Sequence, residues 1–101
     1  MKTYTLNVDD NTSFKEMGAF IHNNQIKEGD ELVINMNLTY EFNFMMRQVF
    51  FFLVRECVSN NRQAEFKKRL PETTQKVTEF YEDELLAKAL TEDTGVLVSV
   101  K

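Results

Sequence analysis

The chain has 101 residues, of which 43% are hydrophobic and 28% charged, and it carries a formal net charge of −4. This length is that of one domain with one modest core, which leaves no room for a separate catalytic domain. The acidic balance argues against non-specific nucleic-acid binding as the main activity. The single cysteine, Cys57, cannot form an internal disulfide, and the N-terminus shows no apolar secretory segment, so we expect a cytoplasmic protein.

The first forty residues predict a strand, a helix and a second strand. Residues 2–8 ("KTYTLNV") alternate apolar and polar side chains, which is typical of a half-buried strand. The "SFKE" at Ser13–Glu16 fits a capping box, and the helix behind it extends to about Asn24. Residues 31–37 ("ELVINMN") alternate again, with one side formed by Leu32, Ile34 and Met36. Two strands joined by one helix predict a parallel pair.

The remaining residues predict two more helices and a closing strand. An apolar helix covers about 41–58, and the "SNN" behind it is typical of a helix end. Residues 63–70 fit either one helical turn or a short edge strand. A further helix covers about 71–90, and "TEDTG" predicts a turn before the strand 96–100. The expected fold is a single α/β domain in the order β-α-β-α-(α or β)-α-β, with helices packed on a small mixed sheet.

The run "FNFMMRQVFFFLV", from residue 42 to residue 54, holds ten apolar residues in thirteen. It is shorter than the about 20 apolar residues that cross a membrane, and it carries charge, so we expect no membrane span. A rotation of about 100° per residue separates two faces of this helix. We expect the first to be a core stripe formed by Phe42, Met45, Met46, Val49, Phe52, Leu53 and Cys57, with Phe50 at its edge. The second face interleaves apolar residues with arginines, namely Phe44, Arg47, Phe51, Val54, Arg55 and Val58.

Two explanations of this second face stay open at the level of sequence. The C-terminal helix covers it, as happens to most helices that are apolar all round. Alternatively it is an interface, because Phe, Met and Arg are enriched in the cores of protein interfaces. Residues 42–71 also carry six basic and two acidic side chains in an otherwise acidic chain. Such a basic island fits either internal pairing or a face for an acidic partner.

No pattern in the sequence indicates catalysis or a cofactor. His22 and Cys57 are single copies of their types, and Cys57 lies on the apolar stripe, where a small buried thiol is expected. One His and one Cys cannot make a structural zinc site, and the three glycines stand too far apart for a phosphate loop. We therefore predict no enzyme activity, no cofactor, no metal and no small-molecule ligand.

The strand "ELVINMN", followed by a short loop and the helix "FNFMMRQVFFFLV", resembles STAS-like domains of the anti-sigma-factor antagonist type. The resemblance covers about residues 32–70 and is one of layout and hydrophobic pattern. The family's functional Ser or Thr lies in the loop before that helix. The matching "NLTYEFN" has Thr39 but no Asp-Ser-Gly motif, and Asn35 or Asn37 stands where the family has an acidic residue. The resemblance implies a sheet-and-helix domain that binds protein, and it transfers no site.

These observations together predict protein–protein interaction without catalysis. The expected surface is the aromatic and arginine face of helix 41–58, and the expected partner is another protein or a second copy of the chain. An alternative is an inhibitor of the phage or toxin-system type that masks its partner with acidic residues of the C-terminal helix, namely Glu79, Glu82, Asp83 and Glu84. A small enzyme of unknown chemistry is the third class.

Overall fold

The sheet consists of three strands that run in the same direction. The computed structural model describes residues 1–40, 42–62 and 82–101. Strands β1 (Thr3–Asp9), β2 (Glu31–Asn37) and β3 (Leu97–Val100) lie in the order β1-β2-β3, and both neighbouring pairs are parallel. The predicted α/β class and the parallel β1–β2 pair are confirmed. Within the described residues the sheet is parallel, and the expectation of a mixed sheet is wrong there.

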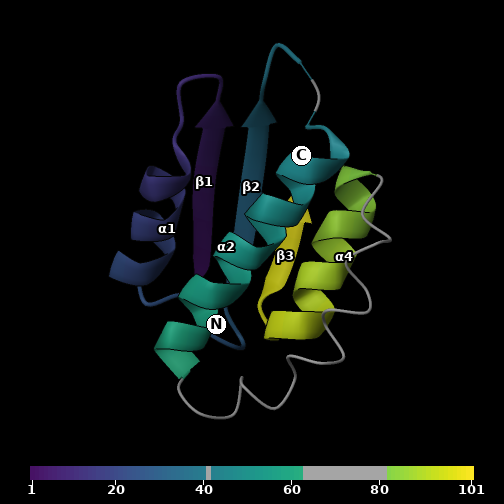
Figure 1. Ribbon diagram of the computed structural model, residues 1–101. Coiled ribbons are helices and arrows are strands. Elements are labelled where there is room, and N and C mark those ends of the chain that lie inside the picture. Colours follow the sequence, from purple (N-terminus) through teal and green to yellow (C-terminus); the bar gives the residue numbers. More distant parts are fainter. Residues whose placement is uncertain (41, 63–81) are drawn as a thin grey trace.

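One face of this sheet carries the core, and helices cover it. The alternation predicted for the strands is confirmed, since the inward side chains are buried: Leu6, Val8, Leu32, Ile34 and Val98. Helices α1 (Phe14–Asn23), α2 (Phe44–Arg62) and α4 (Asp83–Thr94) all lie on that side, as Figure 1 shows. The other face exposes Thr3, Thr5, Asn7 and Leu97. Parallel sheets are usually covered on both faces, whereas among the described residues this one has two layers.

Helix α1 begins where the capping box predicts. The Oγ of Ser13 accepts a hydrogen bond from the backbone N–H of Glu16 at 3.1 Å. The apolar side of α1 is buried at Met17 and Ile21. Gly18 faces α2 so closely that a Cβ there would lie 3.3 Å from both Leu53 and Cys57. The absence of a side chain at residue 18 therefore sets the distance between the two helices.

Helix α2 is displaced along the sequence from its predicted range of 41–58. It begins at Phe44 because the side-chain oxygen of Asn43 caps it, accepting from the N–H of Met46 at 2.9 Å. It also continues through the "SNN" that was expected to end it. The side chain of Asn61 donates to the carbonyl oxygens of Ile26 at 3.0 Å and of Ile21 at 3.4 Å. These bonds attach the last turn of α2 to the end of α1, which explains why the helix persists there.

Helix α4 ends at Thr94, so the predicted turn over "TEDTG" is wrong for its first four residues. Gly95 terminates the helix in the left-handed region, with φ of 73°. The hydroxyl of Thr91 donates to the carbonyl of Ala87 at 2.9 Å and accepts from the N–H of Val98 at 3.0 Å. This last turn thus binds β3. The prediction for 63–70 and the predicted helix start at 71 fall outside the described residues. The prediction of one helix through 71–90 is wrong at Glu82, whose extended backbone (φ −135°, ψ 158°) caps the beginning of α4.

We predict that Gly18→Leu lowers the free energy of unfolding by about 1–3 kcal/mol, because the new side chain overpacks the contact between α1 and α2. Ala19→Leu is the matched control, since residue 19 on the same helix is exposed. Urea unfolding of both variants checks this. Equal stability of the two variants would contradict the close approach of the helices.

Candidate functional site

The arginine-bearing face of α2 points into the molecule. Phe51, Val54 and Val58 are fully buried, and Arg47 and Arg55 are 8% and 4% exposed. Helix α4 packs beside this face (Figure 1). Five of the six predicted interface residues are therefore interior, and the interface hypothesis is wrong for them. The sixth, Phe44, has a side chain outside the described part of the structure. Cover by the C-terminal helix, the other explanation, is confirmed.

Two ion pairs explain how arginines come to lie inside. Arg47 binds Asp83 with 2.8 Å between Nη2 and Oδ1, at the beginning of α4. Arg55 binds Asp93 with 3.3 Å between Nε and Oδ2, at its end, and both of these side chains are buried. Burial lowers the pKa of the Arg55 guanidinium, and the Asp93 carboxylate acts in the opposite direction. The two pairs align α2 and α4 in parallel along their length.

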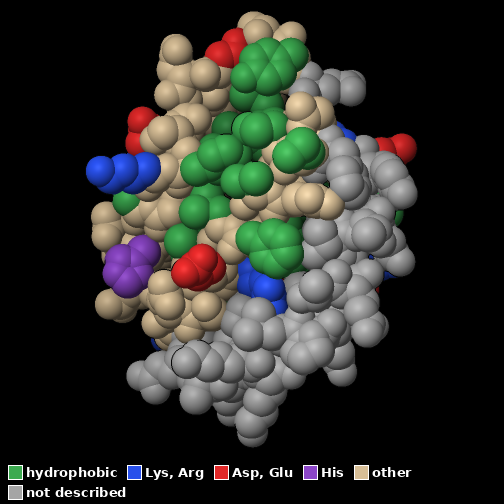
Figure 2. Space-filling view, viewed as in Figure 1, with side chains coloured by type: hydrophobic (Ala, Val, Ile, Leu, Met, Phe, Trp, Pro, Cys, Tyr) green, Lys and Arg blue, Asp and Glu red, His purple; other side chains and the backbone are tan. Residues whose placement is uncertain are grey.

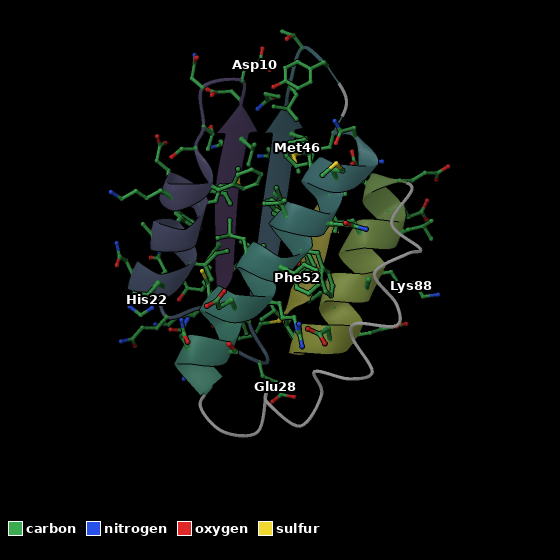
Figure 3. All side chains as sticks on the ribbon, in the orientation of Figure 1. Asp10, His22, Glu28, Met46, Phe52 and Lys88 are labelled. Atoms are coloured by element: carbon green, nitrogen blue, oxygen red, sulfur yellow. The ribbon has the colours of Figure 1, made fainter. Side chains whose placement is uncertain are left out.

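The outward face of α2 is apolar where a helix facing water is normally polar. Met45, Val49 and Phe52 are 72%, 46% and 38% exposed. They follow one another at i, i+4 and i+7, so they form one line along the helix, here called the outer row. Figure 2 shows hydrophobic side chains gathered along α2, and Figure 3 places Phe52 in the middle of that helix.

The outer row corrects the predicted core stripe. Three of the stripe's residues form the row and are exposed. The other members of the stripe are buried or partly buried, as expected: Phe42, Phe50, Met46, Leu53 and Cys57. Helix α2 is thus rotated about its own axis from the expected orientation. The face that carries the arginines is the one that packs into the core and against α4. Sequence periodicity alone did not separate two faces that are both rich in apolar residues.

Phe52 is exposed at one edge yet held in place by its neighbours. Its ring meets that of Phe51 edge-on, with 5.6 Å between the centroids. The guanidinium carbon of Arg55 lies 5.7 Å from the centroid of the Phe52 ring. Arg55 is in turn fixed by Asp93. A side chain ordered in advance loses less conformational entropy when a partner binds.

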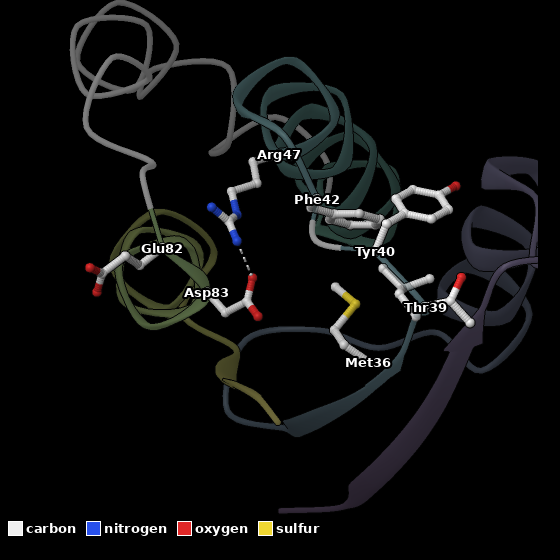
Figure 4. Close-up of a pocket in the computed structure, with 8 residues that line it drawn as sticks. Met36, Thr39, Tyr40, Phe42, Arg47, Glu82 and Asp83 are labelled. Carbon is white, nitrogen blue, oxygen red and sulfur yellow. Dashed lines mark hydrogen bonds and ion pairs between the residues drawn. The ribbon is translucent and has the colours of Figure 1, made fainter.

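A hollow of about 660 Å³ lies beyond the carboxyl end of β2 (Figure 4). It forms where β3 stops, since Val100 pairs with Ile34 while β2 continues to Asn37. Its apolar lining consists of Met36, Leu38, Tyr40 and Phe42. Its polar lining consists of Thr39, Arg47, Glu82 and Asp83. Ligands of open α/β sheets often bind at this edge, but here the Arg47–Asp83 pair already joins two opposite charges in the wall.

The loop that matches the STAS-like functional loop is fixed by a carboxylate from the end of β1. Thr39 donates to Asp10 through its backbone N–H at 3.1 Å and through its hydroxyl at 2.5 Å. The side-chain bond, with the backbone bond after it, lowers the pKa of Asp10. The hydroxyl of Thr39 therefore donates its hydrogen bond within the chain. Its acidic partner is Asp10, and not a residue at the end of β2, where the STAS-like pattern has its acidic residue.

The remaining titratable candidates do not converge on a catalytic site. His22 is exposed at the end of α1, and Cys57 is partly buried against Gly18. Burial, and then the neighbouring Glu56, raise the pKa of the Cys57 thiol, which disfavours the reactive thiolate. Within residues 1–40, 42–62 and 82–101, no three His, Cys, Asp or Glu side chains are grouped to hold a metal ion.

The acidic face proposed as an alternative is only partly described. Glu82 and Glu84 are exposed, while Asp83 binds Arg47 within the chain. Glu79 lies outside the described residues, as do Lys67–Arg69 and the side chain of Arg62 from the basic island. Two of that island's basic residues, Arg47 and Arg55, pair internally.

Comparisons of the chain with protein-family models, with curated proteins and with solved structures found no match. The STAS-like resemblance therefore stays a prediction. Among the helices that the structure describes, none has both the length and the apolar character required to cross a membrane.

We predict that a new carboxylate destabilises the protein strongly on the inner face of α2 and hardly at all on the outer row. Val49→Glu changes the free energy of unfolding by no more than about 0.5 kcal/mol, because residue 49 is on the outer row. Val54→Glu on the same helix places a carboxylate in the core and destabilises by several kcal/mol, at least about 3. Thermal unfolding of the two variants checks the orientation of the helix. A large loss for Val49→Glu would contradict it.

We also predict that Asp93→Ala destabilises the protein by about 3–5 kcal/mol, because Arg55 then lies buried without its carboxylate. Asp83→Ala costs less, about 1–3 kcal/mol, because it leaves the buried Arg47 without this carboxylate at a site where Asp83 itself is partly exposed. Denaturant unfolding measures both. The double variant Arg55→Met with Asp93→Leu recovers most of the loss, and a double variant as unstable as Asp93→Ala would show that packing, rather than the stranded charge, sets the cost.

Proposed function

We propose that this chain is a protein-binding domain without catalysis, and that its contact surface is the outer row of α2. The observation that supports the proposal most is the exposure of Met45, Val49 and Phe52 in one line. Exposed apolar residues scattered singly are ordinary, whereas a contiguous apolar patch on a folded domain indicates an interaction site. The single free thiol, Cys57, is compatible with a reducing compartment such as the cytoplasm.

The composition of the row supports a protein partner rather than a small molecule. Met adapts its shape to an apposed surface, and Phe contributes a large contact area at interfaces. A helix with anchors at i, i+4 and i+7 is also a recurring way of presenting side chains to an apolar groove or to another helix. The row is convex, whereas small-molecule sites are concave.

The chemistry of the partner follows from what the row lacks. The arginines that the sequence placed at an interface point inward and pair with Asp83 and Asp93. Between Met45 and Phe52, the only partly exposed polar side chain is that of Gln48. The partner surface expected is therefore apolar, and binding depends little on ionic strength because exposed charge contributes little to it.

A photoreactive phenylalanine analogue placed at residue 49 tests this function in cells that make the protein. We expect irradiation to attach a defined protein to the chain, identified by mass spectrometry, and Met45→Glu in the same chain to abolish the adduct. The analogue at Lys15, an exposed residue of α1, is the matched control and gives no such adduct. Absence of any adduct at residue 49, with the protein folded and expressed, would contradict the proposed function.

A further inference from the structure

We propose that the hollow beyond the carboxyl end of β2 binds a small organic cation, that is, an ammonium group attached to an apolar or aromatic body. The hollow is a different surface from the outer row, so this inference does not rest on the proposed function. It departs from the sequence-based expectation of no small-molecule ligand. The reason is that the lining residues come from β2, the loop behind it, α2 and the beginning of α4, and they meet only in the folded chain.

The position and the size of the hollow are those of a ligand site. Open sheets of parallel strands bind ligands at the carboxyl ends of their strands, and the hollow lies at this edge of β2. Its volume of about 660 Å³ is within the roughly 300–1,000 Å³ of small-molecule sites. Because β2 continues past the end of β3, Met36 and Leu38 are only partly buried and give the hollow an apolar lining. The apolar part of a ligand is covered there.

The charged groups of the lining favour a cation over an anion. They are one guanidinium, that of Arg47, and two carboxylates, those of Glu82 and Asp83, so negative charge exceeds positive charge. The guanidinium already binds Oδ1 of Asp83 at 2.8 Å. An anion in the hollow would compete with that carboxylate and would meet Glu82 as a further like charge. The net charge of −4 on the whole chain also attracts cations.

Asp83 carries an acceptor that its ion pair does not use. Its carboxylate faces Arg47 and Met36 across the hollow (Figure 4). The ion pair uses Oδ1, and among the described residues no hydrogen bond reaches Oδ2 of this side chain, which is 43% exposed. An ammonium group has three donors, so it binds Oδ2 while Arg47 keeps Oδ1. Glu82 adds an exposed carboxylate at the rim, since its side chain makes no capping hydrogen bond to α4.

Two aromatic rings complete the chemistry of the hollow. Tyr40 and Phe42 lie between β2 and α2, on the side opposite Asp83 in Figure 4. The face of an aromatic ring attracts a cation that lies within about 6 Å of its centroid. Phe42 is buried against Phe50, with 5.9 Å between the ring centroids, whereas Tyr40 is 61% exposed. A carboxylate oxygen on one side and aromatic rings on the other match an ammonium with an apolar body better than a phosphate.

Nuclear magnetic resonance titration of the purified, isotope-labelled chain tests the proposal with three probes that share one body. Phenethylamine (charged at neutral pH), phenethyl alcohol and phenylpropionate differ in their head groups alone. We expect phenethylamine to shift the backbone amide signals around Thr39 and Asp83 saturably, with a dissociation constant on the order of 1 mM for so small a ligand. Phenethyl alcohol binds at least about tenfold more weakly, because it makes no charge-assisted hydrogen bond. Phenylpropionate does not bind detectably.

Three variants assign the binding to the lining. Tyr40→Ala changes an exposed side chain, so the fold is retained, and it weakens phenethylamine binding by about threefold or more. Asp83→Asn keeps an oxygen for Arg47 but removes the charge, and it weakens binding by about tenfold. Glu84→Gln is the matched control, because it removes one charge from an exposed residue of the same helix that does not line the hollow. It changes binding by less than about twofold.

Four results would overturn the inference, and the dispersion of amide signals confirms that each variant is folded. Absence of a saturable shift with phenethylamine up to about 10 mM excludes the site. Equal binding of phenethylamine and phenethyl alcohol indicates an apolar hollow that does not select charge, and tighter binding of phenylpropionate indicates an anion site. Equal losses in Asp83→Asn and Glu84→Gln indicate a diffuse effect of charge. If Asp83→Asn unfolds, Tyr40→Ala decides by itself, and unchanged binding in that variant rejects the site.

Discussion

The buried ion pair between Arg55 and Asp93 decides which side of α2 enters the core. The Arg55 guanidinium is only 4% exposed, and it requires a neighbouring carboxylate because burying an isolated charge costs several kcal/mol of folding free energy. Asp93 supplies it from the last turn of α4, and Gly95 ends the helix directly behind. Once Arg55 is inside, the face with Phe51 and Val54 is inside as well. The exposure of the outer row is then a geometric consequence, since Val54 lies on the opposite side of α2 from Met45 and Val49.

The second pair, Arg47 with Asp83, has a different role at the other end of the same contact. It closes the wall of the hollow beyond β2, and its carboxylate is 43% exposed. Because the Asp83 carboxylate is partly solvated, this pair stabilises the fold less than the Arg55–Asp93 pair does. It does, however, fix the first turn of α4 against α2, so that α4 covers the inner face along its length. The helical layer is therefore aligned at both ends by charge and filled between them by apolar side chains.

The sequence predicted most of the fold because alternation and capping are local signals. The strands, the Ser13 cap and the buried sides of β1 and β2 follow from residues within a few positions of one another. The orientation of α2 depends instead on residues 36 and 38 positions apart, Arg47 with Asp83 and Arg55 with Asp93. An analysis of apolar periodicity counts arginine as a surface residue, and it contains no information about a carboxylate more than 30 positions away. The signal in the sequence that fits this pairing is the spacing of eight residues between the arginines and of ten between the aspartates.

The two outer surfaces of the molecule differ in a way that favours the helical side for binding. The sheet face that none of the described helices covers satisfies its polar side chains locally, as when Asn35 donates to Asn7 at 3.0 Å and Thr3 to Glu31 at 2.9 Å. Such pairs make the open face compatible with water. The outer row has no such compensation, because polar residues at Met45 and Val49 would cost the fold nothing and would serve solubility better. The proposed contact with another protein surface accounts for apolar residues at positions where the fold does not bury them.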